Sequence, residues 1–355
     1  MATLLASALL ASVTTGRGFS EVILEEAKWT LTSAAPSPVA SESCAALIER
    51  YSAPKLPSTG PPRQMPEELV AGFTMDGSIE LGEFFVDDTM GGQGSHYKYP
   101  RRDIDHMIKG AAAALGSTRG GRKNDHWIAD ALKANRDIIK GGDVLIYGSM
   151  EPWYEAMMIA MEAKSVTTVE YNELTYDHPG ITTATPQELP AIVEAKGGFD
   201  VALSISSFDH DGLGRYGDPL EPNNDLRAMR TARCFLKDTG VLVATVPIGP
   251  DVVVWNLHRR YGERRLPWML DDWMVEHVVG WKGDDMLTKV ANWRQSYEPV
   301  FVPTPVHVLT HVLVHTSLPG EIFSSGAGSK NVFATLGGAG ALTEKHEGKR
   351  RGVKQ

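Results

Sequence analysis

The sequence lacks several features that whole classes of protein require. Among its 355 residues the only cysteines are Cys44 and Cys234, with no second pair to complete a zinc site or build a disulfide framework. A reducing, cytoplasmic environment is therefore the default expectation. No uncharged apolar run reaches the roughly eighteen residues that a spanning helix needs, so no transmembrane segment is predicted. The apolar start, Met1–Val13, has no preceding Lys or Arg and fits either a short helix or a cleaved targeting signal.

Positive charge is also in short supply. The formal net charge is −9, which excludes the broad basic face that grips a phosphate backbone and makes nucleic acid an unlikely partner. Hydrophobic residues make up 42% of the chain and charged residues 22%, values close to those of ordinary globular proteins. The composition therefore predicts a folded globular protein, neither wholly disordered nor fibrous.

The character of the sequence changes along the chain. Pro, Ser and Ala crowd Ser33–Arg63, which reads as a linker or surface extension with little that can carry a core. Apolar residues at helical spacing then predict two helices near 104–115 and 127–138. We expect an N-terminal extension and linker over 1–98, an α/β domain over 99–318, and a disordered tail over 319–355.

Strands and helices alternate between Asp143 and Thr316, as in a parallel sheet covered on both faces. A helix is expected over Glu151–Ala163 with Pro152 at its first position, and a left-handed helix cap at Gly240. The two late segments Trp273–Trp281 and Val306–Val314 could form an antiparallel pair. The predicted parallel strands are Asp143–Gly148, Val166–Tyr171, Ile181–Ala184, Val201–Ile205 and Val241–Val246. The fold class predicted is α/β, a doubly wound Rossmann-like sheet that is mostly parallel.

A glycine and an acid stand at the ends of the first two strands of this sheet. Glu170 follows Gly148 by twenty-two residues, a spacing that places a carboxylate where it can accept hydrogen bonds from both hydroxyls of a ribose. The turn Gly148–Trp153 has a single glycine, the carboxylate of Glu151 and a proline without an amide hydrogen, so it serves a pyrophosphate poorly. A cationic sulfonium nucleoside such as S-adenosylmethionine suits it better than a dinucleotide. The spacing is equally compatible with an ordinary sheet in which Gly148 makes a tight turn and Glu170 is a solvated strand end.

Four long strings resemble one family: GSMEPWYEA, TTVEYNELTYDHPGITTATP, FDVALSISSFDHDGLGRYGDPL and VPIGPDVVVWNLHRRYGERRLP. They are similar to the DUF268 proteins, whose function is itself inferred and which look like class I S-adenosylmethionine-dependent methyltransferases. The resemblance runs from about Asp143 to Pro267. It implies a methyltransferase-type sheet, with Gly148 in the first motif, Glu170 as the ribose acid and Ser206–His210 beside the transferred methyl group.

The sequence departs from that pattern at two places. The turn has one glycine where two or three are usual, and Thr185, Pro186 and Gln187 replace the acid that faces the adenine amine. Gln187 or a backbone carbonyl could serve instead. The candidate cofactor-binding residues are Gly148, Ser149, Glu151, Trp153, Glu170, Tyr171, Asn172, Gln187, Ser206 and Ser207.

The candidate catalytic group is the imidazole of His210, which stands between Asp209 and Asp211. Either carboxylate could orient the ring or raise its basicity, and a hydroxyl acceptor needs such a base to remove its proton. Two alternatives remain: these residues only tie down the loop, or they bind a metal ion, which adjacent residues rarely do without distant ligands. No metal site is predicted.

A glycine-rich loop, Gly212–Pro219, and the segment after the fifth strand are expected to shape the acceptor site. Arg215 and Asp218 could bind the acceptor or pair with each other, while Trp255 fits packing better than binding. The candidate substrate residues are Arg215, Tyr216, Asp218, Asn256, His258 and Arg259.

Together these features predict a methyltransferase acting on a small or medium polar acceptor, with O-methylation favoured by the histidine. A catalytically silent nucleoside-binding or scaffold protein is the alternative, and an NAD-type oxidoreductase comes third because of the turn chemistry. The oligomeric state is not predicted.

Overall fold

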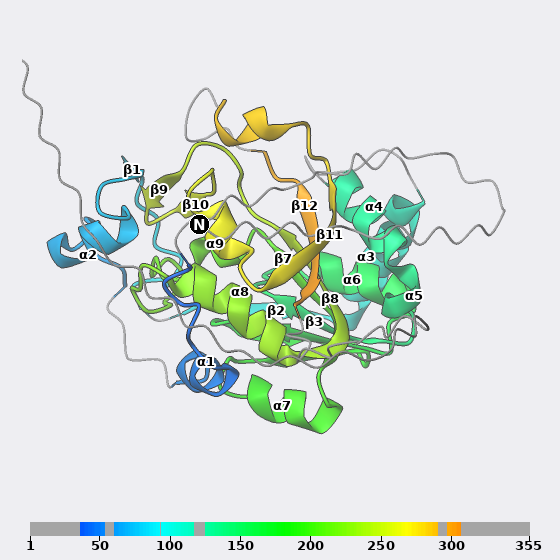
Figure 1. Ribbon diagram of the computed structural model, residues 1–355. Coiled ribbons are helices and arrows are strands. Elements are labelled where there is room, and N and C mark those ends of the chain that lie inside the picture. The colour runs from blue at the N-terminus through cyan, green and yellow to red at the C-terminus, as the bar shows by residue number, and fades with distance from the viewer. Residues whose placement is uncertain (1–35, 54–59, 93, 117–124, 290–296, 307–355) are drawn as a thin grey trace, which may run out of the picture. The chain divides into compact units, whose positions relative to one another are not determined.

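The computed structural model describes residues 36–53, 60–92, 94–116, 125–289 and 297–306 (Figure 1). All of them lie in one compact unit, Met1–Val308. The predicted N-terminal segment Met1–Val13 and the tail over 319–355 lie outside the described residues.

The central sheet has seven strands in the order β11-β12-β8-β7-β3-β4-β6. Its six strands other than β12 follow the doubly wound order 3-2-1-4-5-6, and β12 is inserted antiparallel between β8 and β11. The strands are β3 (Asp143–Tyr147), β4 (Ser165–Val169), β6 (Ile181–Ala184), β7 (Phe199–Ile205), β8 (Leu236–Thr245), β11 (Trp273–Val279) and β12 (Val300–Pro305). The predicted α/β class with a mostly parallel sheet is confirmed.

Two small sheets accompany it. One joins β1 (Glu80–Glu83), β9 (Val252–Trp255) and β10 (His258–Arg260), and the other pairs β2 (His96–Tyr99) with β5 (Glu173–Tyr176). Strands β1 and β2 both precede residue 100 and pair with β9 and β5, respectively. The N-terminal part of the chain therefore contributes strands to both small sheets.

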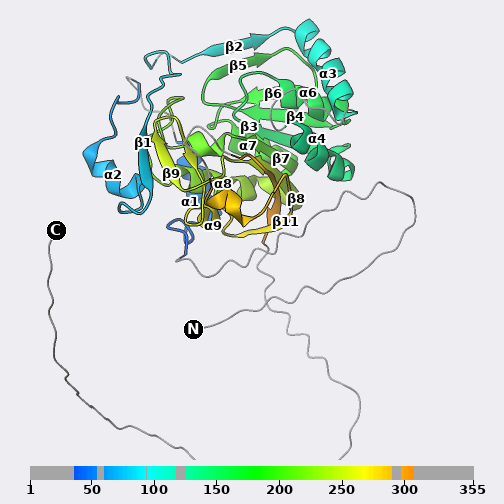
Figure 2. The same ribbon diagram turned by 90° about the horizontal axis from the view of Figure 1, so that it is seen from above.

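Helices cover both faces of the central sheet (Figure 2). One face packs against α3 (Arg101–Leu115), α4 (Asp125–Ala134) and α6 (Trp153–Ala160); the other packs against α7 (Leu189–Lys196) and α8 (Asn224–Phe235). The remaining helices are α1 (Cys44–Tyr51), α2 (Glu67–Phe73), α5 (Arg136–Ile139) and α9 (Leu266–Met269), with short 3₁₀ turns η1 (Phe208–His210) and η2 (Asp284–Leu287).

The two faces follow from strand periodicity. In β3, Val144 and Ile146 pack in the cluster with α3, α4 and α6, while Leu145 and Tyr147 pack on the opposite face. Side chains alternate along a strand, so a strand covered on both sides must be apolar throughout. The unbroken apolar run that predicted this strand has that cause.

Three expectations about elements need correction. Ser33–Arg63 is not only a linker, because Val39 and Leu47 are buried in the core beside α8. Gly240 lies inside β8 rather than capping a helix; the left-handed cap is Gly197, which ends α7 with φ of 69°. Strand β11 does form an antiparallel pair, but its partner is β12 rather than the predicted Val306–Val314, most of which lies outside the described residues.

The cysteines are also placed differently from the expectation. Cys44 of α1 and Cys234 of α8 form a disulfide with 5.6 Å between their Cα atoms. Disulfides persist mainly in oxidising environments. The cysteine argument for a reducing compartment therefore loses its support, and a cytoplasmic location stays only a prediction.

Candidate functional site: a crevice at the switch point of the sheet

The candidate site lies where the chain direction across the sheet reverses. From β3 the chain continues to β4 and β6 on one side, whereas β7 and β8 lie on the other. Ligands of open α/β sheets bind outside the carboxyl ends of the strands at such a point. A crevice of about 70 Å³ is found there, and it opens beside a second cavity of about 600 Å³.

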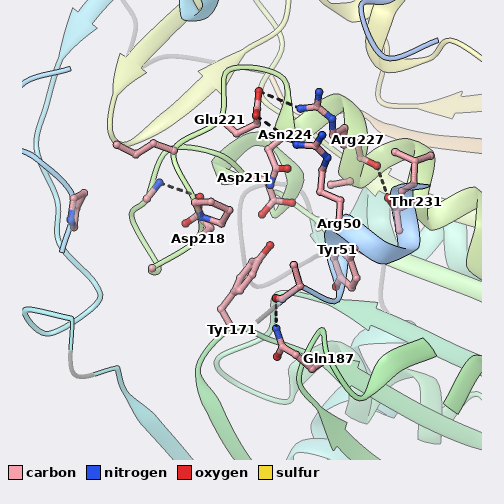
Figure 3. A pocket seen from close by; sticks show the side chains of 18 of the residues that line it. Arg50, Tyr51, Tyr171, Gln187, Asp211, Asp218, Glu221, Asn224, Arg227 and Thr231 are labelled. Atoms are coloured by element: carbon pink, nitrogen blue, oxygen red, sulfur yellow. Dashed lines mark hydrogen bonds and ion pairs between the residues drawn. The ribbon is translucent and has the colours of Figure 1, made fainter. Parts of the chain in front are cut away.

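Ten of the candidate residues meet at these two cavities. The crevice is lined by Gly148, Glu170, Tyr171, Ser206, Ser207, His210, Asp211 and Tyr216. The larger cavity is lined by Tyr171, Gln187, Asp211 and Asp218 (Figure 3). Tyr171 and Asp211 thus belong to both cavities.

Gly148 forms the tight turn after β3. Its φ is 62°, and a Cβ there would collide with the side chain of Ser207 at the end of β7. The turn needs a glycine for both reasons. This one glycine brings the ends of β3 and β7 into contact.

Glu170 stands directly after β4 and is buried, with 8% of its surface exposed. Its Oε1 accepts hydrogen bonds from the backbone N–H of Asn172 at 3.2 Å and from its Nδ2 at 3.3 Å. Burial raises the pKa of Glu170 to about 7, and the carboxyl of Asp218 adds to the rise. Asn172 therefore supports the acid rather than lining a cavity.

The two cavities have an acidic lining. Burial and repulsion from Asp218 raise the pKa of Asp211 well above its ordinary value, and burial also raises that of Asp218. Arg50 and Arg227 line the larger cavity too, but both pair with Glu221, at 3.8 and 3.1 Å (Figure 3). The carboxyls of Glu170, Asp211 and Asp218 are therefore the acidic groups of the two cavities whose pKa values burial raises.

The imidazole of His210 is hydrogen-bonded to a backbone carbonyl group. Its Nδ1 donates to the carbonyl oxygen of Leu257 at 2.6 Å, which leaves Nε2 as the lone-pair nitrogen of the neutral ring. Burial, followed by the nearby Arg215 cation, lowers the pKa of His210 to about 4. Of the two roles considered for the neighbouring carboxylates, orienting the ring or raising its basicity, the lowered pKa favours the first.

Asp209 lies beneath the crevice and is fully buried. Its Oδ2 is 3.6 Å from Nε2 of His210 and accepts a hydrogen bond from Ser206 Oγ at 3.4 Å. Burial raises its pKa to about 6, although the imidazole of His258 opposes the rise. Asp209 can position His210 but cannot reach a ligand itself.

Several candidate cofactor residues lie away from both cavities. Ser149 uses its carbonyl oxygen to accept a hydrogen bond from Tyr176 Oη at 2.7 Å, and Glu151 is exposed. Trp153 packs against the core between the sheet and α3, because its helix turns it to that face. We do not retain these three as ligand contacts.

The same holds for most of the candidate substrate residues. Arg215 pairs with Asp88 at 2.7 Å, not with Asp218, whose Oδ2 instead accepts from the amides of Gly212 and Gly214. Asn256 exchanges two hydrogen bonds with the backbone of Val86. Their polar groups organise loops.

Arg259 and His258 lie deeper still. Arg259 is fully buried, donates to the carbonyl oxygen of Asp211 at 2.6 Å and lies 3.6 Å from Asp225 Oδ2. The ring of His258 stacks on that of His210 with 6.5 Å between centroids, but it lines neither cavity. Of the candidate substrate residues, Tyr216 and Asp218 remain at the cavities.

One residue at the junction of the cavities was missed. Tyr51, the last residue of α1, lines both. Ser43 as an N-cap followed by Leu47, Ile48 and Tyr51 at helical spacing was the available signal. The helix was not predicted because the prolines around it led us to interpret Ser33–Arg63 as a linker.

Within the described ranges, no helix is long and apolar enough to cross a membrane. Across the same residues, no group of three or more His, Cys, Asp or Glu side chains could hold a metal ion. The part of the site that the structure describes therefore contains no set of metal ligands.

Comparison with known proteins gives a family match and distant structural likenesses. No curated protein matches the sequence. A proposed S-adenosylmethionine-dependent methyltransferase of Streptococcus mutans is 11% identical with a TM-score of 0.31; the match covers 49% of this chain and only 48% of that one. A Burkholderia thailandensis 1,6-didemethyltoxoflavin N1-methyltransferase is 15% identical with a TM-score of 0.37, over 69% of this chain and 92% of the other. Such low scores do not establish a shared fold.

The sequence match is confined to the middle of the chain. Residues 141–291 match a family described as "Caenorhabditis protein of unknown function, DUF268". This range contains the Gly148 turn, Glu170 and His210. Apart from Tyr51, the residues that line the crevice lie within the segment that matches this family.

Proposed function

We propose that the protein is an S-adenosylmethionine-dependent methyltransferase acting on a small or medium polar acceptor. The observation that carries the proposal is the acidic lining of the two joined cavities beside the Gly148 turn. Burial raises the pKa of Glu170, Asp211 and Asp218, and the carboxyl of Asp218 adds to the rise at the other two, so a bound cation would favour their ionised forms. A cationic sulfonium nucleoside fits this lining, and an anionic dinucleotide does not.

The size of the cavities supports the same ligand. The crevice of about 70 Å³ is smaller than a nucleoside, but the adjoining cavity of about 600 Å³ falls within the usual range for small-molecule sites. Glu170 would accept the ribose hydroxyls at the junction. Tyr171 and Gln187 would face the base from the larger cavity, where Gln187 already donates to the carbonyl oxygen of Ala53 at 2.9 Å. When bound, the cofactor supplies an electrophilic methyl carbon.

The contribution of the chain is alignment and proton removal. His210 has its Nδ1 proton fixed on Leu257, so its Nε2 can accept a proton from an acceptor hydroxyl. Asp209, 3.6 Å from that nitrogen, would stabilise the imidazolium once it forms. This arrangement favours O-methylation.

Thermal unfolding with S-adenosylhomocysteine, with NAD and without ligand tests the proposal. S-adenosylhomocysteine should raise the melting temperature while NAD leaves it unchanged, since a ligand at one hundred times its Kd adds about 2.7 kcal/mol to the free energy of unfolding. Stabilisation by NAD, or by neither compound, would contradict it. Methyl-labelled cofactor incubated with fractionated extract would then identify the acceptor.

Binding without catalysis is the second candidate function. The low pKa of His210, about 4, makes its imidazole a weak base, and a single glycine forms the turn. A protein that binds S-adenosylmethionine but transfers no label to any fraction would support this alternative.

A further inference from the structure

Helix α1 closes one side of the larger cavity, although it lies outside the DUF268 segment. Arg50 and Tyr51 line that cavity (Figure 3), as does Leu47. Tyr51 also lines the crevice. Tyr51 therefore stands where the two spaces meet. A ligand in either cavity can therefore contact this side chain.

The helix is fastened to α8 at several points. The Cys44–Cys234 disulfide links the two helices across 190 residues of sequence. The ring of Tyr51 packs edge-on against Phe235 with 5.7 Å between centroids. Just before α1, Glu42 pairs with Arg227 at 2.8 Å.

The far end of this segment is tied to the opposite side of the cavity. Gln187, in the loop between β6 and α7, donates its side-chain N–H to the carbonyl oxygen of Ala53. The segment from Cys44 to Ala53 thus bridges the cavity from α8 to the loop after β6. The attachment to α8 is a covalent disulfide bond, whereas the attachment to the loop after β6 is a hydrogen bond.

We propose that α1 is a wall of the nucleoside site, in which Tyr51 contacts the planar heteroaromatic base and the Cys44–Cys234 disulfide holds Tyr51 in place. Ligand affinity then depends on the thiol–disulfide state of the protein. A dithiol would give two electrons and two protons to the sulfur–sulfur bond, which breaks into two thiols, while the dithiol becomes a disulfide. The identity of the ligand rests on the proposed function.

Calorimetric titration with S-adenosylhomocysteine tests the proposal on the full chain. Reduction by a dithiol should weaken binding about tenfold, and the double variant Cys44→Ser/Cys234→Ser should bind like the reduced protein whether or not the dithiol is present. Tyr51→Ala should weaken binding to a similar degree, whereas Tyr51→Phe keeps the ring and should bind like the wild type. Tyr97→Ala, which removes a half-buried ring lining neither cavity, is the matched control.

A second measurement needs no variant. Because coupling between two equilibria is reciprocal, S-adenosylhomocysteine should make the disulfide of the wild type harder to reduce in a fixed dithiol buffer, by the same factor. Thiol titration measures the reduced fraction even if a variant fails to fold.

The outcomes separate the two proposals. Equal affinity of the oxidised and reduced wild type, with no ligand effect on reduction, would overturn the role of α1 and leave the proposed function standing. An oxidised wild type that binds no S-adenosylhomocysteine would contradict the proposed function, and the role of α1 with it.

Discussion

The Glu170 carboxyl is buried at the end of β4, where its pKa is about 7. The ionised form offers both oxygens as acceptors to the two ribose hydroxyls and carries the negative charge that attracts a sulfonium, whereas the neutral form has one O–H donor and fewer acceptor sites. Ionisation of a buried acid, however, opposes folding. Binding and stability should therefore respond in opposite directions when this charge is removed.

For Glu170→Gln we expect binding of S-adenosylmethionine at pH 8 to weaken about tenfold to a hundredfold, the value of hydrogen bonds to a charged group. Wild-type affinity should rise from pH 6 to pH 8 as the carboxyl ionises, and the variant should lose this rise. Titration calorimetry at both pH values measures it. A variant that binds as tightly as the wild type would remove Glu170 from the ribose site.

His210 is the residue on which turnover should depend. We expect His210→Ala to keep cofactor binding and to lower kcat for methyl transfer about a hundredfold, the usual loss when a general base is removed. The labelled-cofactor assay measures the rate with the acceptor fraction it identifies. His277→Ala, on β11 and away from the site, is the control. Unchanged turnover in His210→Ala would leave the ring a purely structural role.

At the scale of the element, α6 carries a buried acid of its own. Glu155 is fully buried in the first turn of α6, and its Oε1 accepts a hydrogen bond from Thr168 Oγ1 of β4 at 2.7 Å. Burial raises its pKa to about 7. Between the unfolded pKa near 4.5 and the folded pKa near 7 the folded protein holds the extra proton, so stability falls as pH rises through this window.

Replacing Glu155 with Gln should remove that loss. We expect Glu155→Gln to raise the free energy of unfolding at pH 8 by on the order of 1 kcal/mol and to have little effect at pH 4, where the wild-type carboxyl is already neutral. Urea unfolding at the two pH values measures the difference. The control is Glu162→Gln, which changes an exposed acid in the loop between α6 and β4. This variant should not reproduce the pH-dependent gain in the free energy of unfolding. Equal effects at both pH values would contradict the assigned pKa.

Element boundaries show what the local pattern could predict. The apolar runs of β3 and β7 were assigned correctly because a strand covered on both faces must be apolar along its length. Gly240 was misread because glycine after a helical run is typical of a cap, yet here α8 passes directly into β8. Gly240 lies in the register shift between the pairs Phe199–Leu236 and Val201–Val241, an irregularity of the β7–β8 pairing that no local pattern predicts.

At the scale of the whole molecule, the disulfide joins the N-terminal segment to the core. Its loop spans 190 residues, so reduction should release much chain entropy in the unfolded state. We expect Cys44→Ser/Cys234→Ser to lose about 2–4 kcal/mol of unfolding free energy and to remain folded, since Val39 is buried in the core cluster that contains α8 and Ile48 packs against that cluster. Urea midpoints measure the loss. A dithiol should lower the wild-type midpoint to that of the variant; equal midpoints for the oxidised wild type and the variant would contradict a stabilising disulfide.

The sequence by itself determined the parallel sheet, its first turn and the acid after its second strand, because strand periodicity and turn chemistry are local properties. It also carried the DUF268 match over residues 141–291. The tertiary structure alone decided which polar groups reach a cavity: Asn256 and Arg259 were equally plausible by position, but their partners, Val86 and Asp225, come from other parts of the chain. Tyr51 and the cysteine pair belong to the same class, since their roles arise from contacts with α8, far away in sequence, which no local pattern encodes.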